Sequence, residues 1–257
     1  MNNTNTPLIS IITVCFNSAK TIRRTIESVL NQTYTNIEYI IVDGKSKDST
    51  VAIIEGYAPQ FAEKGIKYRW VSEPDKGIYD AMNKGIKMAT GEYINFQGSD
   101  DWLELDACES IYNCYKSSAS FDIVYGVARY MDGNKFVKLS QVNECYLGDE
   151  NMNHQAMFFK RKLFDLFGYY TLKYTICSDW DYNLRIFGKV TFSRVEIILT
   201  NYSISGISST GDVKIREEGN SILLHHKQIS KSTYLIRYCK TLFLKLIVLI
   251  NRVMGNK

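Results

Sequence analysis

Short runs of apolar residues alternate with amphipathic segments through the first hundred residues of the chain. Runs that are rich in β-branched and aromatic side chains are typical of buried strands, and four of them lie at 8–14, 37–42, 67–71 and 92–96. Segments with helical spacing of apolar residues lie between them, at 18–31, 48–57 and 77–89. This alternation predicts an α/β fold, with a mostly parallel central sheet flanked by helices.

The loops that follow the four predicted strands should meet at one edge of the sheet. Right-handed crossovers place the carboxyl ends of parallel strands on the same side, and open α/β sheets bind ligands at that side. The sequence therefore predicts a single site, formed by the loops after Val14, Val42, Val71 and Phe96.

Beyond a predicted helix at 103–115, the pattern is less regular. Short strands are expected at 122–129, 135–139, 156–159 and 189–194, and helices at 161–167 and 178–187. These short strands indicate a smaller, mixed or antiparallel edge. Glycine and serine at 206–211 predict a flexible loop that could close over a ligand, followed by a helical tail.

The length of 257 residues suits one α/β domain with a C-terminal appendage. We expect the domain to span 1–210 and the helical tail to span 211–257.

The six cysteines form no CxxC motif and no metal-spaced cluster, which favours reduced thiols in the cytoplasm. The polar amino terminus lacks the features of a signal peptide, so we expect the chain not to be exported. A net charge of +4 gives little support to nucleic-acid binding.

The tail is basic and strongly apolar. Arg237, Lys240, Lys245 and Arg252 interrupt its apolar sequence, so it contains no stretch of about 20 uncharged residues that could span a bilayer. At helical spacing these charges fall within one arc. The pattern predicts a basic amphipathic helix on an anionic membrane surface, or alternatively a helix packed on the core or in a dimer interface.

Asp100 and Asp101 follow the last of the four strands. Two carboxylates at a strand end can hold a hard divalent cation against a diphosphate, whereas a helix cap would need only one acid. The turn after the first strand, Cys15-Phe16-Asn17-Ser18-Ala19, contains no glycine, which disfavours NAD and FAD. No P-loop is present either, so a diphosphate would have to be neutralised by a metal or by side chains.

Four ordered segments resemble the family 2 glycosyltransferases of the GT-A fold, of the bacterial surface-polysaccharide type. They are SIITVCFN at 10–17, SVLNQTYTNIEYIIVDGKSKDST at 28–50, EPDKGIYDAMNKGIKMATGEYINFQGSDD at 73–101 and SDWDYNLR at 178–185. The resemblance implies a nucleotide-binding half at 1–101 and an acceptor-binding half at 102–210.

For the donor, the resemblance implies that Val14 and Phe16 line the base pocket and that Asp43 hydrogen-bonds a uracil ring. It also places the Asp75-Lys76 loop beside the nucleotide. The alternative for Asp43 is a turn residue before the next glycine. The alternative for Phe16 is core packing, which does not exclude the first role.

For the reaction, the resemblance implies that Asp101 binds Mn²⁺ or Mg²⁺, while Asp100 reaches the ribose or shares the metal. Asp179 occupies the position of the catalytic base, and Asp181, two residues later, should point elsewhere. The alternative for Asp179 is an acid that is stabilised by the helix dipole. His154 falls where related enzymes carry a histidine near the diphosphate or the acceptor, with a structural role as its alternative.

Two departures concern the donor region and the branch of the family. Gly44 stands where the family more often has a second acid, and Phe96-Gln97-Gly98-Ser99 precede the aspartate pair where the family often has a leucine and an asparagine. No Gln-x-x-Arg-Trp motif follows the predicted base, which disfavours the processive branch.

The sequence as a whole predicts an inverting, metal-dependent transfer of one sugar from a nucleotide-diphosphate donor, expected to be UDP-linked. The expected acceptor is a hydroxyl of a lipid-linked glycan precursor in cell-surface polysaccharide synthesis. The expected location is the cytoplasm, peripheral on the inner face of the membrane, with a homodimer as a further expectation. The alternatives are a sugar-phosphate nucleotidyltransferase and a non-catalytic nucleotide- or glycan-binding module.

Overall fold

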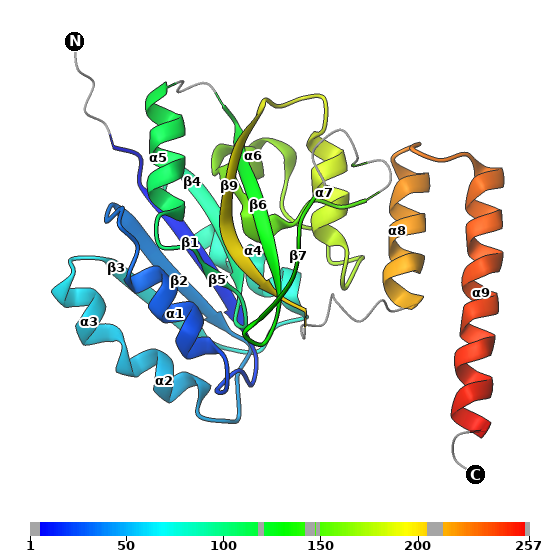
Figure 1. Cartoon of the computed structure of the whole chain (residues 1–257), viewed down its shortest axis with the longest axis horizontal. Coiled ribbons are helices and arrows are strands. Elements are labelled where there is room, and N and C mark those ends of the chain that lie inside the picture. Colours follow the sequence, from blue (N-terminus) through cyan, green and yellow to red (C-terminus); the bar gives the residue numbers. More distant parts are fainter. Residues whose placement is uncertain (1–5, 118–120, 142–146, 148–149, 205–212, 255–257) are drawn as a thin grey trace.

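The computed structural model describes residues 6–117, 121–141, 147, 150–204 and 213–254. Figure 1 shows a curled sheet with helices on both faces and two further helices at the C-terminal end. The described strands are β1 (Ile9–Cys15), β2 (Ile37–Asp43), β3 (Lys67–Ser72), β4 (Tyr93–Gly98), β5 (Trp102–Leu103), β6 (Ile123–Asp132), β7 (Lys135–Leu139), β8 (Met157–Lys160) and β9 (Phe192–Ser203). The described helices are α1 (Ile22–Leu30), α2 (Thr50–Gly56), α3 (Ala58–Glu63), α4 (Ile78–Met88), α5 (Ala107–Ser117), the 3₁₀ turn η2 (His154–Ala156), α6 (Lys162–Phe167), α7 (Ser178–Ile186), α8 (Val213–His225) and α9 (Lys231–Met254).

The first four long strands form the predicted parallel unit. Their order is β3-β2-β1-β4, and every neighbouring pair is parallel. Cys15 pairs with Asp43, and Asp43 pairs with Ser72, so these strands end at the same level. The loops after β1, β2, β3 and β4 therefore lie along one edge, as the crossover rule predicts.

The remaining strands form the mixed part of the sheet, which confirms the expected fold class. β8 runs antiparallel to both β4 and β6, β9 runs parallel to β6, and β5 runs antiparallel to β9. The predicted start of the helix at Leu103 is wrong, because Trp102 and Leu103 pair with β9 and α5 begins only at Ala107. The strand expected at 189–194 begins later and is longer, since β9 continues along β6 as far as Ser203.

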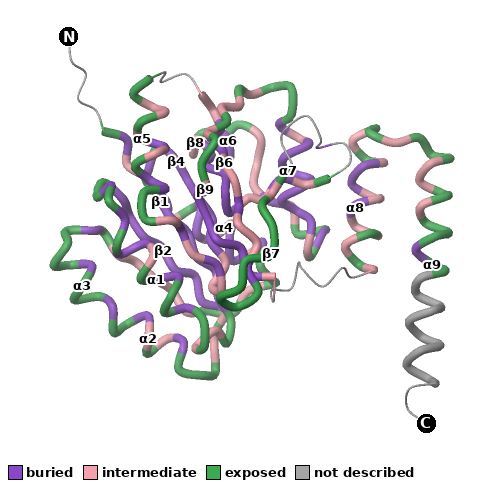
Figure 2. Tube along the Cα trace, in the orientation of Figure 1, coloured by how far each residue is buried: buried purple, intermediate pink, exposed green. Residues whose placement is uncertain are grey.

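Both faces of β1, β2 and β4 are buried, which explains why these three strands are mostly apolar, whereas the edge strand β3 is partly exposed. Along β1, Ile12 and Val14 pack on the face that also carries α4, whereas Ile9 and Ile11 pack with α1 on the other. Figure 2 shows this buried centre in purple, running through β1, β2 and β4. The core thus holds the carboxyl edge of the sheet on a rigid base.

The C-terminal segment forms two helices, α8 and α9. α8 lies against α7, and α9 lies beside α8 and away from the sheet (Figure 1). No helix within the described residues is both long and apolar enough to cross a membrane. The loop expected at 206–211 lies outside the described residues.

Candidate active site

Hydrogen bonds join the loops at the carboxyl edge of the parallel strands. Gly44 N donates to Cys15 O at 2.9 Å, and Glu73 N donates to Asp43 O at 3.0 Å, so the ladder continues beyond the strands. The hydroxyls of Ser18 and Ser99 lie 2.8 Å apart and link the loops after β1 and β4. The four predicted loops therefore form one continuous surface.

Asp43 is fully buried at this edge. Its carboxylate accepts from the backbone N–H and the hydroxyl of Ser46, from the Ser72 hydroxyl at 2.6 Å, and from the Cys15 thiol at 3.5 Å. A carboxylate offers about four acceptor positions, so the protein itself occupies them. Asp43 therefore stabilises the turn at Ser46, and its contact with a uracil ring stays a prediction.

The other predicted donor residues differ in exposure. Val14 is buried in the core, whereas Phe16 is 59% exposed, so core packing is wrong for Phe16. A Cβ added to Gly44 would lie 2.5 Å from Asp75 Oδ2 and 3.4 Å from the Phe16 ring. Glycine at position 44 thus leaves room for the side chains of Asp75 and Phe16. Lys76, which follows Asp75, is exposed.

Asp101 is held inside the protein by three donors. Its Oδ1 accepts from Ser203 N at 2.8 Å, and its Oδ2 accepts from Gln155 Nε2 at 2.8 Å and from Gly98 N at 3.2 Å. Burial, and after it the negative charge of Asp100, raise the pKa of Asp101 above its usual value. Burial likewise raises the pKa of Asp100.

The aspartate pair fits a divalent cation. The raised pKa values show that two neighbouring carboxylates are costly to ionise here, and a cation would offset that cost. Carboxylate oxygens are the ligands that Mg²⁺ and Mn²⁺ prefer. Asp100 is only partly buried, and Asp101 Oδ1 accepts one protein donor, so acceptor positions remain for an ion.

Asp179 lies at the start of α7, with its carboxylate buried. It accepts from the Tyr79 hydroxyl at 2.7 Å and from Asn151 Nδ2 at 2.6 Å, and it lies 3.1 Å from His154 Nδ1. Burial alone would raise the pKa of Asp179, but the contacts with His154, Tyr79 and Asn151 outweigh it and lower the pKa. Asp179 is therefore ionised at neutral pH and able to accept a proton.

The two acids of α7 face different neighbours, as predicted. Asp181 Oδ2 accepts from Arg185 at 2.5 Å, and Asp181 Oδ1 lies 2.9 Å from His226 Nε2 on the chain just after α8. The structure places His154 with Asp179, and an electrostatic contribution from His154 also acts to lower the pKa of Asp101. His154 thus lies within electrostatic reach of both acids.

Several contributing residues were not singled out in the sequence. Tyr79 and Asn151 hold Asp179, and Gln155 and the backbone of Ser203 hold Asp101. The stretch 151–155 could have indicated site residues, because four polar residues occur there just before the buried strand β8. Tyr79 and Ser203 carried no local signal, since their partners are about 100 residues away.

Comparison with known proteins defines the class. Residues 10–180 match the model of Glycosyl transferase family 2. The chain is 33% identical over 208 residues to a PGL/p-HBAD biosynthesis glycosyltransferase of Mycobacterium tuberculosis, covering 79% of this chain and 80% of that protein. The chain belongs to glycosyl transferase family 2 and is a glycosyltransferase.

Solved structures share the fold. A fragment of S. aureus TarS in complex with UDP-GlcNAc superposes with a TM-score of 0.68 at 16% identity, covering 91% of this chain and 71% of that one. The mannosyltransferase PcManGT from Pyrobaculum calidifontis, in complex with GDP-Man and Mn²⁺, superposes with a TM-score of 0.62 at 17% identity. That match covers 87% of this chain and 64% of PcManGT. These neighbours confirm the GT-A fold.

Proposed function

We propose that the protein transfers one sugar from a UDP-sugar to a hydroxyl of a lipid-linked glycan precursor, with inversion at the anomeric carbon. The observation that carries this proposal is the environment of Asp179, an ionised carboxylate that is buried and held by three side chains. A general base needs a fixed position and an available lone pair. Asp179 has both, in a family whose members are sugar transferases.

In the proposed reaction, the acceptor hydroxyl oxygen attacks the anomeric carbon of the donor sugar. The bond from that carbon to the diphosphate oxygen breaks, and its electron pair leaves with the nucleoside diphosphate. Asp179 takes the hydroxyl proton as the new bond forms. Because attack and departure occur on opposite faces, a single displacement inverts the configuration.

Asp100 and Asp101 are proposed to hold Mn²⁺ or Mg²⁺ beside the departing diphosphate. A bound cation would stabilise the negative charge that grows on the leaving group. Gln155 and the backbone of Ser203 fix the Asp101 carboxylate, so its orientation does not depend on the ion. The Mn²⁺ named for PcManGT supports this assignment by analogy.

The donor is proposed to lie across 1–101, and the acceptor across 102–210. Phe16, Asp75 and Lys76 would lie beside the nucleotide, with Val14 and Asp43 at the ends of the strands below it. UDP is favoured by the complex of TarS with UDP-GlcNAc, whereas PcManGT binds GDP-Man. The identity of the nucleobase in the donor is therefore the first property to test.

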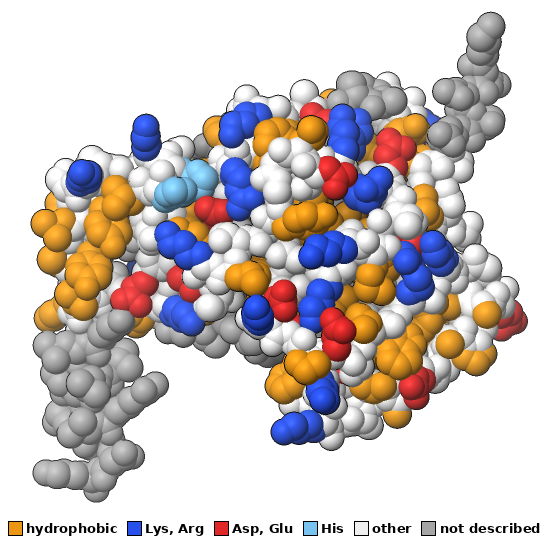
Figure 3. All heavy atoms as spheres, turned by 180° about the vertical axis from the view of Figure 1, so that it is seen from behind, with side chains coloured by type: hydrophobic (Ala, Val, Ile, Leu, Met, Phe, Trp, Pro, Cys, Tyr) orange, Lys and Arg blue, Asp and Glu red, His pale blue; other side chains and the backbone are white. Residues whose placement is uncertain are grey.

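The C-terminal helix is proposed to bring the enzyme to an anionic membrane surface. Leu235, Ile236 and Phe243 are 60%, 58% and 63% exposed on α9. Figure 3 shows hydrophobic side chains gathered over the described part of this helix, near Lys and Arg side chains. Exposed apolar groups together with positive charge suit the interface of anionic lipids. Pairing of α9 in a homodimer is the competing arrangement, and a sedimentation measurement separates the two.

A thermal-shift screen tests the donor assignment. UDP-sugars, GDP-sugars and dTDP-sugars are each added with and without Mn²⁺, because ligand binding stabilises the native state by about 2.7 kcal/mol at a hundredfold excess over Kd. We expect the largest rise in Tm with a UDP-sugar and Mn²⁺ together. A rise with GDP- or dTDP-sugars but none with UDP-sugars would contradict the uracil assignment.

An activity assay separates the alternatives. Incubation with sugar phosphate and UTP should release no pyrophosphate, since that release defines a nucleotidyltransferase. Incubation with the donor and a lipid-linked acceptor should release UDP. A protein that binds donor but releases neither product would be a binding module.

A further inference from the structure

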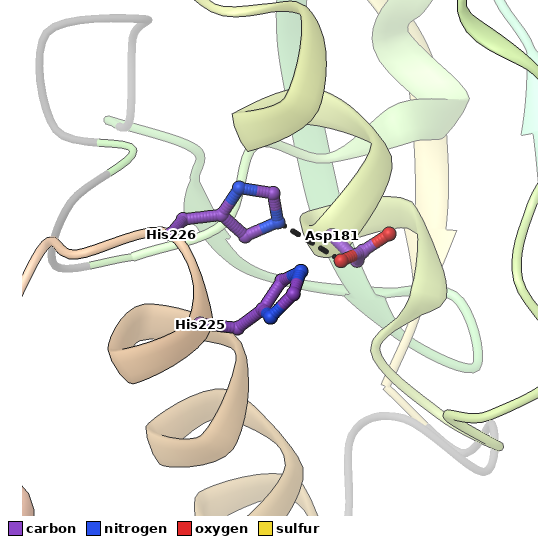
Figure 4. A group of neighbouring side chains, drawn as sticks. All are labelled: Asp181, His225 and His226. Atoms are coloured by element: carbon purple, nitrogen blue, oxygen red, sulfur yellow. Dashed lines mark hydrogen bonds and ion pairs between the residues drawn. The ribbon is translucent and has the colours of Figure 1, made fainter.

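A second group of metal-ligating side chains lies on the far side of α7 from Asp179. Asp181 on α7 and His225 and His226 at the end of α8 each offer one ligand atom, and these atoms lie within 4.8 Å of one another. Figure 4 shows both imidazole rings reaching from the end of α8 toward the Asp181 carboxylate. The closest pair is His226 Nε2 and Asp181 Oδ1, at 2.9 Å.

The two consecutive histidines lie where α8 ends. Side chains of neighbouring residues on a helix point about 100° apart. Here the helix stops at His225, and Lys227 adopts a left-handed conformation with φ of 57°. Lys227 N donates to Leu224 O at 3.1 Å, and Gln228 N donates to Leu223 O at 2.8 Å, which closes the helix end.

The two helices are held together independently of the histidines. A Cβ at Gly219 of α8 would lie 2.7 Å from the Trp180 ring of α7, so the helices are in close contact there. Glu218 of α8 accepts from Ile176 N at 2.9 Å and from Cys177 N at 3.0 Å, just before α7 begins. The three ligands therefore sit on a fixed frame, as a metal site requires.

The ligand set selects a class of ion. Two imidazoles and one carboxylate suit Zn²⁺ and its neighbours in the transition series, and they form the three-ligand set of zinc sites that keep an open position. Asp181 is 5% exposed, while His225 is exposed, so an ion could enter from the side of His225. Arg185 donates to Asp181 Oδ2, which fixes the carboxylate and leaves Oδ1 toward the histidines.

This cluster is separate from the proposed donor site. Residues two apart on a helix point in nearly opposite directions, and the partners of Asp179 and Asp181 are different residues throughout. The oxygen ligands of Asp100 and Asp101 suit Mg²⁺ or Mn²⁺, whereas imidazoles select the softer ions.

We propose that Asp181, His225 and His226 bind one divalent transition-metal ion of the Zn²⁺ class, which ties α8 to the helix that carries Asp179. The ion would join the C-terminal helices to the catalytic half by a bond stronger than the His226–Asp181 hydrogen bond alone.

Metal binding to the full-length protein, stripped of metal, tests this proposal. Co²⁺ is titrated as a spectroscopic probe in excess Mg²⁺, and Zn²⁺ binding is measured by calorimetry. The wild type should bind one Co²⁺ with the intense visible bands of a four-coordinate site, and Zn²⁺ should displace it. Loss of a supporting partner costs about 10- to 100-fold in metal affinity, so loss of a ligand should cost at least as much.

His225→Ala is the main variant, because His225 is exposed and its removal leaves the His226–Asp181 contact in place. We expect this variant to keep its metal-free Tm, to lose the Co²⁺ bands and to bind Zn²⁺ at least about 10-fold more weakly. The matched control Lys231→Ala should retain both signals, and Asp101→Asn should also retain the Co²⁺ bands. Equal Zn²⁺ affinity and equal spectra in wild type and His225→Ala would overturn the proposal, as would bands that vanish in Asp101→Asn.

Discussion

His154 presents Nδ1 to Asp179 Oδ2 at a distance of 3.1 Å. The contact joins η2 to the first turn of α7, and it is the first of the contacts that lower the pKa of Asp179 against the effect of burial. An imidazole that approaches a buried carboxylate in this way fixes both partners. The pair thus sets the protonation state and the orientation of the proposed base.

Replacement of Asp179 by asparagine should abolish transfer without loss of donor binding. Asparagine has nearly the same shape but cannot accept the hydroxyl proton, and loss of a general base costs about 10²- to 10⁴-fold in rate. The measurements are kcat for transfer and Kd for the UDP-sugar. Asp106→Asn, at an exposed position, is the control. Unchanged turnover in Asp179→Asn would exclude this residue as the base.

His154→Gln should move the acidic limb of the pH profile. The lowered pKa keeps wild-type Asp179 ionised down to acidic pH. Removal of His154 removes a contact that lowers this pKa, so the effect of burial should raise the pKa in the variant. The acidic limb of kcat/KM should therefore shift to higher pH in the variant. Tyr79→Phe removes another contact that lowers the pKa and should shift the limb in the same direction. If the acidic limb of kcat/KM stays at the same pH in both variants, His154 and Tyr79 do not control the pKa of Asp179.

The same pKa shift predicts how stability depends on pH. The pKa of Asp179 is lower in the folded state than in the unfolded state, so its contribution is present above the unfolded value and is lost as the pH falls through the folded value. In urea unfolding, Asp179→Asn should flatten the acidic decline in the free energy of unfolding. The decline of wild type and variant should coincide if Asp179 makes no contribution.

Asp101→Asn should remove the metal dependence of donor binding. The variant keeps the size of the side chain but halves the charge of the pair that is proposed to hold the cation. We expect Mn²⁺ to strengthen UDP binding in wild type by at least about tenfold and to have no effect in the variant. Calorimetry with and without Mn²⁺ measures the difference. An equal gain in both proteins would place the cation elsewhere.

Glu218→Ala should weaken the start of α7. Glu218 accepts from the backbone N–H groups of Thr175, Ile176 and Cys177, directly before the helix of Asp179. Loss of these bonds to a carboxylate should cost about 2 kcal/mol of stability and should lower kcat. Thermal unfolding measures the first effect and single-turnover transfer the second. Arg216→Ala on the same helix is the control, and an equal Tm in the two variants would contradict this role.

Gly85→Ala should destabilise the protein through the contact between α4 and β1. A Cβ at this position would lie 2.5 Å from Ile12 Cγ2, a buried methyl group. Overpacking of this kind costs about 1–3 kcal/mol, visible in urea unfolding. Gly56→Ala is the matched control, because open space surrounds Gly56 and alanine there should stabilise α2 by about 1 kcal/mol. Similar effects at both positions would argue against close packing.

The parallel unit could be predicted from the sequence because its buried strands have a recognisable pattern within their own residues. Both faces of β1, β2 and β4 are buried, so each appears as a mostly apolar run. Leu103 was assigned to a helix because its pairing partner, Thr200, lies about a hundred residues away and leaves no local pattern. Phe16 was likewise ambiguous, since an aromatic residue after a buried strand can face either the core or solvent.

Contacts between residues that are distant in the chain also limited what the sequence could predict about the site. Asp100 and Asp101 were proposed from their place at the end of a predicted strand, and Asp179 and His154 were proposed from the resemblance to the family. Tyr79 and Gln155 could not be found, because what distinguishes them is the carboxylate that each contacts across the fold. Sequence motifs thus identify candidate reacting groups, while the contacts that orient those groups are visible in the fold.

The hydrogen bonds that continue the ladder past β1, β2 and β3 have a consequence for the energetics of donor capture. The backbone N–H groups of Gly44 and Glu73 are already hydrogen-bonded, and the absence of a Cβ at Gly44 leaves room for the side chains of Asp75 and Phe16. Binding of a nucleotide at this edge would require little further ordering of the protein backbone after β1, β2 and β3. The conformational entropy lost there on binding should therefore come mainly from the nucleotide. The contribution of these described loops to affinity should then depend on desolvation and on the fit of the base.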